Sequence, residues 1–255
     1  MWDADQYLRF EAERTRPFED LMAQVFRKTA TRIVDLGCGP GNLTRLLAQR
    51  WPEAQVTGVD SSAEMLQAAV TLTIDGRLDF QQADLAAWSP GGPVDLLISS
   101  AAWQWIADHE RLIDHCVGML GPRGTLAVQM PCRFETSSQT VIEEVSADPR
   151  WAGQLRGVGL HRQSVHPVGW YADRLSRRGF AVNAWETMYL HPLTGENPVL
   201  EWLRGTALRP LLARLNETQQ VDFLTDLGER LRGEFPPCGE VTFFPMPRLF
   251  FVAQK

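Results

Sequence analysis

Short apolar runs alternate with longer amphipathic stretches over the first half of the chain. The apolar runs predict buried strands at about residues 32–36, 55–60, 78–83, 94–99 and 124–130. The stretches between them carry helical patterns, so strands and helices alternate along the chain. Such alternation is typical of an α/β fold with a parallel sheet.

Two later runs extend this pattern. Residues 179–189 and 248–253 are rich in aromatic and β-branched side chains and predict two more strands, which makes seven. The segment Ser61-Ser62-Ala63-Glu64 fits a capping box that begins a helix after the second strand. We therefore predict a doubly wound, seven-stranded, mostly parallel sheet of the Rossmann-like kind.

The last two predicted strands are separated by about fifty residues, too many for a bare loop in a compact domain. Residues 200–208 and 217–231 have helical periodicity, and Asn216 is suited to cap the second of these helices. We interpret about residues 191–240 as a helical cap inserted before the last strand. A predicted helix within residues 1–30 adds an N-terminal lid.

Composition favours one elaborated domain over residues 1–255, since 44% of the residues are hydrophobic. The 25 basic and 31 acidic residues give a net charge of −6, which argues against nucleic acid as a partner. No stretch reaches bilayer-spanning length, and the N-terminus is acidic, unlike a secretory signal. We expect a cytoplasmic protein with no membrane partner.

The spacing of cysteines and histidines does not suggest a metal site. The four cysteines form no C-x-x-C pair, so we expect reduced thiols. His109 and His115 lie on one predicted helix but are too far apart for the usual i, i+4 metal pair. We expect no bound metal.

The motif with the most chemical content is residues 34–41, Val-Asp-Leu-Gly-Cys-Gly-Pro-Gly. A buried strand ends there in Asp35, and glycines follow at alternate positions, Gly37, Gly39 and Gly41. Glycine lets the backbone approach a ligand closely. A loop of this kind between a strand and a helix indicates a nucleotide-like ligand.

A nicotinamide or flavin site is the competing interpretation of this loop. Its fingerprint is G-x-G-x-x-G, and Asn42 stands where the third glycine belongs. The spacing found here suits a ligand without a pyrophosphate, and Asp35 would attract a cationic amino group. We therefore interpret the loop as a binding site for S-adenosyl-L-methionine.

Two further acids follow strand ends, where open α/β sheets bind their ligands. Asp60 ends the second strand nineteen residues after Gly41, in the position that binds ribose hydroxyls. Asp84 closes the third strand and is a candidate for the adenine amino group. Either acid alone fits a helix N-cap or a solvated turn as well.

On these residues the chain resembles the class I S-adenosylmethionine-dependent methyltransferases and, within that class, the trans-aconitate 2-methyltransferase family. The more specific stretches span nearly the whole chain: Tyr7-Leu8, residues 12–17, 35–41, 58–62, Gln104-Trp105, and residues 127–131, 208–210 and 247–250. The family tends to have leucine before the Gln-Trp pair, where this chain has Trp103. The resemblance implies methylation of one carboxylate of trans-aconitate, with S-adenosyl-L-homocysteine as the second product.

The resemblance, with the motifs above, assigns two sets of site residues. For the cofactor we expect Tyr7, Arg14, Asp35, Gly37, Gly39, Gly41, Asp60, Ser61, Met65, Asp84, Leu85 and Ser100. For positioning the small tricarboxylate substrate we expect Trp103, Gln104, Trp105, Tyr189, Arg209 and Arg248. The two arginines are chosen because a guanidinium grips a planar carboxylate with two hydrogen bonds.

The implied reaction needs no general base. A carboxylate is ionised at neutral pH and is already a nucleophile. The site must instead hold one oxygen in line with the methyl carbon and exclude water. We therefore expect positioning residues in an aromatic, covered site.

Other functions remain open from the residues alone. Another small carboxylate, or one linked to an acyl carrier, is an alternative acceptor, although an acidic chain offers no obvious basic surface for a carrier. The Asn/Asp-Pro-Pro-Tyr/Phe motif of many nitrogen methyltransferases is absent. A non-catalytic cofactor-binding module has the same fold, since fold does not dictate chemistry.

Overall fold

The computed structural model describes residues 11–132, 137–158, 165–205 and 207–255. The chain divides into two compact units. The first unit comprises Met1–Cys132, Gln163–Thr187 and Arg248–Lys255, and the second comprises Arg133–Arg162 and Met188–Pro247. The division of the chain that we predicted, one domain with a lid and a cap, stays a prediction.

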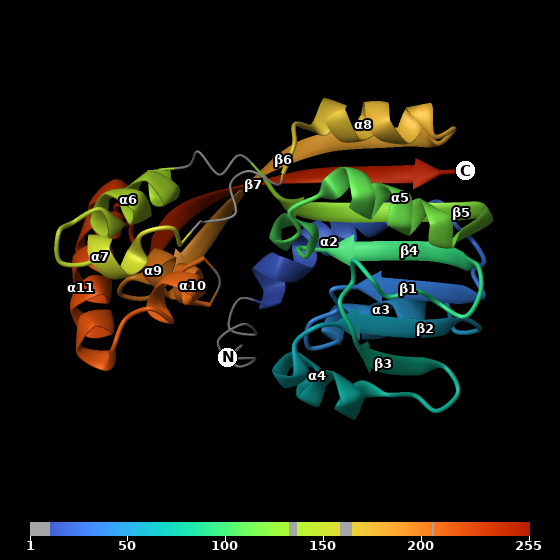
Figure 1. Ribbon diagram of the computed structural model, residues 1–255, viewed down its shortest axis with the longest axis horizontal. Coiled ribbons are helices and arrows are strands. Elements are labelled where there is room, and N and C mark those ends of the chain that lie inside the picture. The colour runs from blue at the N-terminus through green and yellow to red at the C-terminus, as the bar shows by residue number, and fades with distance from the viewer. Residues whose placement is uncertain (1–10, 133–136, 159–164, 206) are drawn as a thin grey trace. The chain divides into compact units, whose positions relative to one another are not determined.

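The sheet has seven strands in the order β3-β2-β1-β4-β5-β7-β6 (Figure 1). The strands are β1 (Arg32–Leu36), β2 (Gln55–Asp60), β3 (Leu78–Gln82), β4 (Val94–Ser100), β5 (Leu120–Pro131), β6 (Ala181–Thr194) and β7 (Val241–Gln254). The pairs β2–β3, β1–β2, β1–β4 and β4–β5 are parallel, and β7 is antiparallel to β5. The predicted doubly wound, mostly parallel sheet is confirmed.

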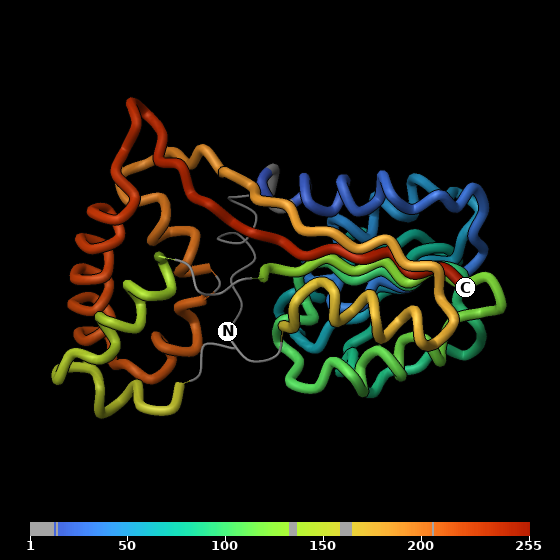
Figure 2. The backbone as a smooth tube through the Cα atoms, turned by 90° about the horizontal axis from the view of Figure 1, so that it is seen from above, coloured from blue at the N-terminus to red at the C-terminus, as the bar shows by residue number. Residues whose placement is uncertain are grey.

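The first unit packs helices on both faces of this sheet, and these helices are α2 (Glu11–Ala23), α3 (Asn42–Arg50), α4 (Ala63–Ala69), α5 (His109–Met119) and α8 (Val168–Arg177). In Figure 2 the blue α2 lies on one face, and the green α5 and yellow α8 lie on the other. Strands β1, β4 and β5 carry nearly continuous buried residues, because both of their faces are covered.

The second unit is mainly helical within its described residues. Its helices are α6 (Ser137–Ser146), α7 (Ala152–Leu155), α9 (Pro198–Arg204), α10 (Arg209–Leu212) and α11 (Glu217–Glu234). Asn216 caps α11 as predicted, and the cap is a full capping box, because the Gln219 side-chain oxygen also accepts a hydrogen bond from the Asn216 N–H. The stretch containing α6 and α7 had no predicted helix.

Three local expectations differ from the structure. Helix α4 is capped by Ser62 instead of Ser61, because the Asp60 carboxylate binds the Ser62 N–H and shifts the turn by one residue. Residues 83–93, between β3 and β4, form turns without a helix, since prolines and glycines interrupt the segment. Strand β6 continues past Tyr189 through Pro192, which an edge strand tolerates.

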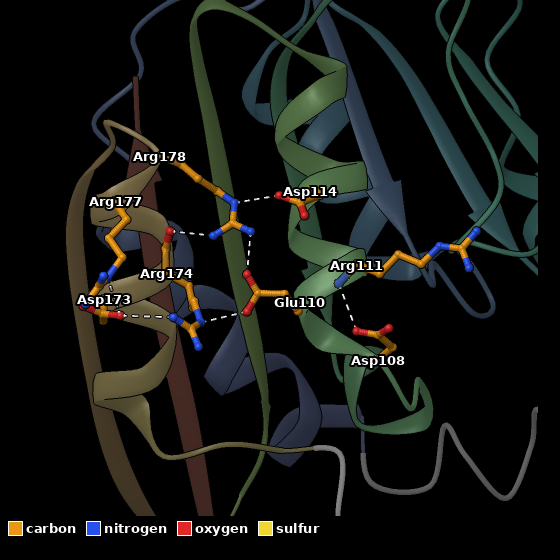
Figure 3. A network of polar contacts seen from close by, with 8 residues as sticks. All are labelled: Asp108, Glu110, Arg111, Asp114, Asp173, Arg174, Arg177 and Arg178. Atoms are coloured by element: carbon orange, nitrogen blue, oxygen red, sulfur yellow. Dashed lines mark hydrogen bonds and ion pairs between the residues drawn. The ribbon is translucent and has the colours of Figure 1, made fainter.

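An ion-pair network joins α5 to α8 (Figure 3). The Arg178 guanidinium donates to Glu110 at 2.6 Å and to Asp114 at 2.7 Å, and Arg174 pairs with the same Glu110 at 2.7 Å. The hydrogen bond from Arg178 holds the pKa of Asp114 below its usual value. Because Arg178 is mostly buried while its acids are partly exposed, the network stabilises the helix pair modestly.

We predict that Arg178→Gln lowers the free energy of unfolding by about 1 kcal/mol, because it removes two of the three ion pairs that the described residues form between the helices and leaves only the one from Arg174 to Glu110. The loss should shrink in high salt. Arg177→Gln is the matched control, since Arg177 is exposed and pairs only with Asp173 on its own helix in the described residues. Urea unfolding measures both; equal losses in the two variants would contradict the role of the network.

Candidate functional site

The glycine loop connects β1 to α3 in a conformation that requires glycine. Gly37 has a φ of 80°, and its N–H donates to the Val59 carbonyl of β2 at 2.7 Å. A Cβ on Gly37 would lie 2.2 Å from the Ala102 Cβ, in the turn that follows β4. The loop is therefore packed directly against the end of β4, which leaves no room for a side chain.

Asp35, near the end of β1, is the most perturbed carboxylate of the site. Its side chain is 2% exposed, and Oδ2 accepts a hydrogen bond from the Thr44 hydroxyl at 2.7 Å. Oδ1 is buried and accepts no hydrogen bond from the described residues. Burial raises the pKa of Asp35 to about 7, with a further contribution from the charge of Asp60 and an opposing one from Thr44.

A buried carboxylate oxygen without a hydrogen-bond partner lowers the stability of the protein unless a ligand supplies that partner. The ligand that would do so is a cation or a hydrogen-bond donor, because an ionised carboxylate only accepts. Asp35 therefore fits the ammonium group that the sequence analysis assigned to it.

Asp60, the last residue of β2, ties the glycine loop to α4. Its Oδ2 accepts from the Gly39 N–H at 2.9 Å, and its Oδ1 accepts from the Ser62 N–H at 2.9 Å. Each oxygen keeps a second lone pair, so the carboxylate can hold the turn and still accept from ribose hydroxyls. Asp60 can therefore stabilise the turn and bind ribose hydroxyls at the same time.

Four of the other expected cofactor residues, Ser61, Met65, Asp84 and Leu85, follow the ends of β2 and β3 in the first unit. Asp84 is exposed and its carboxylate accepts from the Ala86 N–H at 2.9 Å, as in a turn. Met65 is buried in α4, Ser61 is exposed, and Leu85 lies near Gly37. Tyr7 and the side chain of Arg14 lie outside the described residues.

The turn after β4, which we call the β4 turn and define as residues 101–105, is strained and tightly held. Ala101 has a φ of 56°, which is uncommon for a residue other than glycine. Its N–H donates to the Gln129 carbonyl at 2.9 Å, and its carbonyl accepts from the Gln104 side-chain amide at 2.7 Å. Strain of this kind persists only where surrounding contacts fix it, and it concentrates at functional sites.

Arg248 is linked through a buried glutamine to the end of β4, directly before the β4 turn. Its guanidinium donates to Gln129 Oε1 at 3.0 Å, and the Gln129 amide donates to the Ser100 hydroxyl at 2.6 Å. Arg248 lies opposite Pro131, at the carboxyl end of β5, and is 4% exposed. Sequence reasoning missed Gln129, although a glutamine inside a buried strand is a detectable signal.

The aromatic residues expected near the substrate have different surroundings. The Trp103 indole is fully buried and packs edge-on against Phe251, at 5.5 Å between ring centroids. Trp105 is half-buried and Gln104 is buried. In the first unit, therefore, Gln104 and Trp105 lie with Arg248 and Ser100 around the β4 turn.

Tyr189 and Arg209 belong to the second unit. The Tyr189 ring stacks on His191 at 5.9 Å, and His191 stacks in turn on Trp202 at 5.0 Å. Arg209 begins α10 and is half-buried. Their assignment to the substrate stays a prediction from the family resemblance.

The comparisons with known proteins agree with this geometry. A family model described as a methyltransferase domain matches residues 33–124, a span that contains the glycine loop, Asp60 and Asp84. The sheet order and this site define the class, a Rossmann-like methyltransferase.

The chain is 43% identical to the trans-aconitate 2-methyltransferase of Streptomyces avermitilis, over all of this chain and 97% of that protein. With the one from Klebsiella pneumoniae it shares 42% identity, over all of this chain and 98% of the relative. The chain belongs to the trans-aconitate 2-methyltransferase family.

Solved structures show the same fold at low identity. The YcgJ protein of Bacillus subtilis has a TM-score of 0.59 at 14% identity, covering 93% of this chain and 97% of that one. The phosphoethanolamine N-methyltransferase 2 of Haemonchus contortus, in complex with S-adenosyl-L-methionine, has a TM-score of 0.56 at 19% identity. It covers 94% of this chain and 52% of that one.

Within residues 11–132, 137–158, 165–205 and 207–255, each helix is too short or too polar to cross a bilayer. The same part of the chain brings together no three His, Cys, Asp or Glu side chains in a way that could bind a metal ion.

We predict that Gly37→Ala lowers the free energy of unfolding by at least about 2 kcal/mol, because the new Cβ overlaps Ala102 in addition to straining the backbone. Gly179→Ala is the matched control. Gly179 has a φ of 83° but open space around it, so only the backbone strain of about 1 kcal/mol remains. Chemical denaturation compares them, and equal losses would contradict the close packing of the loop.

Proposed function

We propose that this protein methylates one carboxylate of trans-aconitate, with S-adenosyl-L-methionine as methyl donor, and releases the monomethyl ester and S-adenosyl-L-homocysteine. Two lines of support meet here. The full-length identity of 43% is to a protein named for this reaction. The single structural observation that carries the proposal is the buried Asp35 carboxylate, whose orphaned oxygen beside the glycine loop fits a cationic donor.

The cofactor supplies a methyl group bonded to a positively charged sulfur. When the methyl group is transferred, this sulfur leaves as a neutral thioether. The chain's contribution is to hold that cofactor. Asp35 would bind its ammonium and Asp60 its ribose hydroxyls, while Gly37, Gly39 and Gly41 let the backbone approach it. The remaining residues proposed for the cofactor are Tyr7, Arg14, Ser61, Met65, Asp84, Leu85 and Ser100.

On the acceptor side, the chain needs to position an anion rather than to activate it. The attacking oxygen belongs to an ionised carboxylate, so no side chain has to remove a proton. Positive and negative charge disappear together in the displacement, and water, which solvates both, opposes it. Exclusion of water and alignment of one oxygen with the methyl carbon are therefore the tasks of the site.

Arg248 is the cation that the structure supports best for the substrate. It lies at the carboxyl end of β5, and Gln129 fixes its guanidinium in one orientation relative to Ser100. A guanidinium fixed in this way pairs with a carboxylate at little cost in entropy. The other substrate residues that we propose are Trp103, Gln104, Trp105, Tyr189 and Arg209.

The direct test incubates the purified protein with methyl-labelled cofactor and a panel of dicarboxylates and tricarboxylates. We expect label on trans-aconitate as a base-labile ester. Label on other panel members but not on trans-aconitate would reject the substrate.

Arg209→Ala tests the proposed substrate cation of the second unit. We expect its KM for trans-aconitate to be at least about tenfold higher than that of the natural protein, with cofactor affinity within about twofold. Equal losses of cofactor and acceptor binding in Arg209→Ala would reject its role.

The pKa of Asp35 predicts how cofactor binding depends on pH. The carboxyl group has a pKa of about 7 in the ligand-free protein, and only its ionised form attracts an ammonium. Protonation therefore competes with binding, and the cofactor Kd should rise about tenfold from pH 8 to pH 6. Calorimetry at several pH values measures it. In Asp35→Asn the Kd should be higher and nearly independent of pH; the same pH dependence in that variant would contradict the assignment.

A further inference from the structure

A buried hydrogen-bond chain, distinct from the cofactor residues, ends on the β4 turn. It begins at the His166 N–H, which donates to the Tyr171 hydroxyl oxygen at 3.1 Å. The Tyr171 oxygen lies 2.5 Å from Nδ1 of His109, and Nε2 of His109 lies 2.8 Å from the Trp103 carbonyl oxygen. The chain thus connects three separate segments of the first unit.

Only one set of donors and acceptors satisfies this chain with a neutral imidazole. A carbonyl oxygen only accepts, so Nε2 of His109 must carry the hydrogen. Nδ1 then accepts, and the Tyr171 O–H is its donor, while the Tyr171 oxygen accepts from His166. Each of the hydrogen-bonding groups of this chain, the His166 N–H, the Tyr171 hydroxyl, the His109 ring nitrogens and the Trp103 carbonyl, has a partner, which is the condition for a polar network to order a core.

The surroundings keep His109 neutral. His109 and Tyr171 are 1% and 0% exposed. Burial lowers the pKa of His109; the charge of His166 acts in the same direction, whereas the hydrogen bond to Trp103 and the charge of Asp108 oppose it. Burial also raises the pKa of Tyr171, so its proton stays available for His109.

The two helices that carry these side chains are held rigidly. His109 begins α5 and Tyr171 lies in α8, and the Arg174 and Arg178 ion pairs join the same helices (Figure 3). Tyr171 also stacks on Phe251 of β7, with ring centroids 5.2 Å apart. The hydrogen bond to the Trp103 carbonyl is therefore anchored to a fixed scaffold.

The β4 turn is held at its two ends by different groups. The Gln129 backbone carbonyl accepts from the Ala101 N–H at the first end, next to Gly37. His109 binds the Trp103 carbonyl near the second end. Gln104 and Trp105 follow directly after the second of these points. Loss of the His109 contact should release the second end and leave the end beside Gly37 in place.

We propose that His109 and Tyr171 are positioning residues for methyl transfer, which act by fixing the Trp103 carbonyl and thereby the orientation of Gln104 and Trp105 toward the acceptor. This inference rests on the proposed function, because that function places Gln104 and Trp105 beside the substrate. It assigns no contact with substrate to His109 or Tyr171. Their role is the geometry of the turn.

The kinetic test uses Tyr171→Phe, which removes one hydroxyl from the chain. We expect kcat with trans-aconitate to fall about tenfold and cofactor Kd to stay within about twofold. His109→Gln keeps an amide donor in reach of the Trp103 carbonyl and should retain more activity than His109→Leu. Ile113→Val is the matched control, since it loosens α5 at a buried position without touching the chain.

Hydrogen exchange tests the same inference without an acceptor. The amides of Trp105 and Ile106 donate to carbonyls of the β4 turn, at 3.1 and 2.9 Å. Their exchange should be at least about tenfold faster in Tyr171→Phe and unchanged in Ile113→Val. Unchanged exchange in Tyr171→Phe, or equal kinetic losses in Ile113→Val and Tyr171→Phe, would overturn the inference. If the natural protein did not methylate trans-aconitate while the exchange result held, the proposed function would fail and the positioning of the turn would stand.

Discussion

The site depends on one buried charge, the carboxylate of Asp35, which has a hydrogen bond from Thr44 on one oxygen and none from the described residues on the other. A buried carboxylate with a hydrogen bond on only one oxygen destabilises the ligand-free fold. The raised pKa of Asp35 reflects this unfavourable burial of the ionised form. The protein tolerates the cost because a cation can complete the site. Under the proposed function, the bound cofactor supplies the missing partner of this oxygen.

The rest of the site is arranged around this constraint by contacts between strand ends. The Asp60 carboxylate binds Gly39 and Ser62, so the glycine loop and α4 share one anchor. Gly37 packs on Ala102, which brings the strained turn after β4 against the loop. The glycine loop, Asp60 and the turn after β4 thus support one another at a single edge of the sheet, where strand ends of the first unit meet.

Much of this could be predicted from the sequence, because the signals are local. Apolar runs predicted the strands, and the glycine spacing predicted the loop between β1 and α3. The contacts that complete the site join distant residues: Gln129 to Arg248, and His109 to Tyr171, 62 residues further along the chain. Such pairs leave no periodic pattern. The cap at Ser62 was missed by one residue for a related reason, since the Asp60 side chain sets that turn.

The most direct test is a carbon-13 NMR titration of the Asp35 carboxyl group, assigned by the loss of its resonance in Asp35→Asn. In the ligand-free protein we expect a pKa of about 7 for this group. With saturating S-adenosyl-L-methionine, the pKa should fall by about two units or more, because the bound ammonium favours the ionised form. An ordinary carboxyl pKa in the ligand-free protein, or one that the cofactor leaves unchanged, would contradict the account.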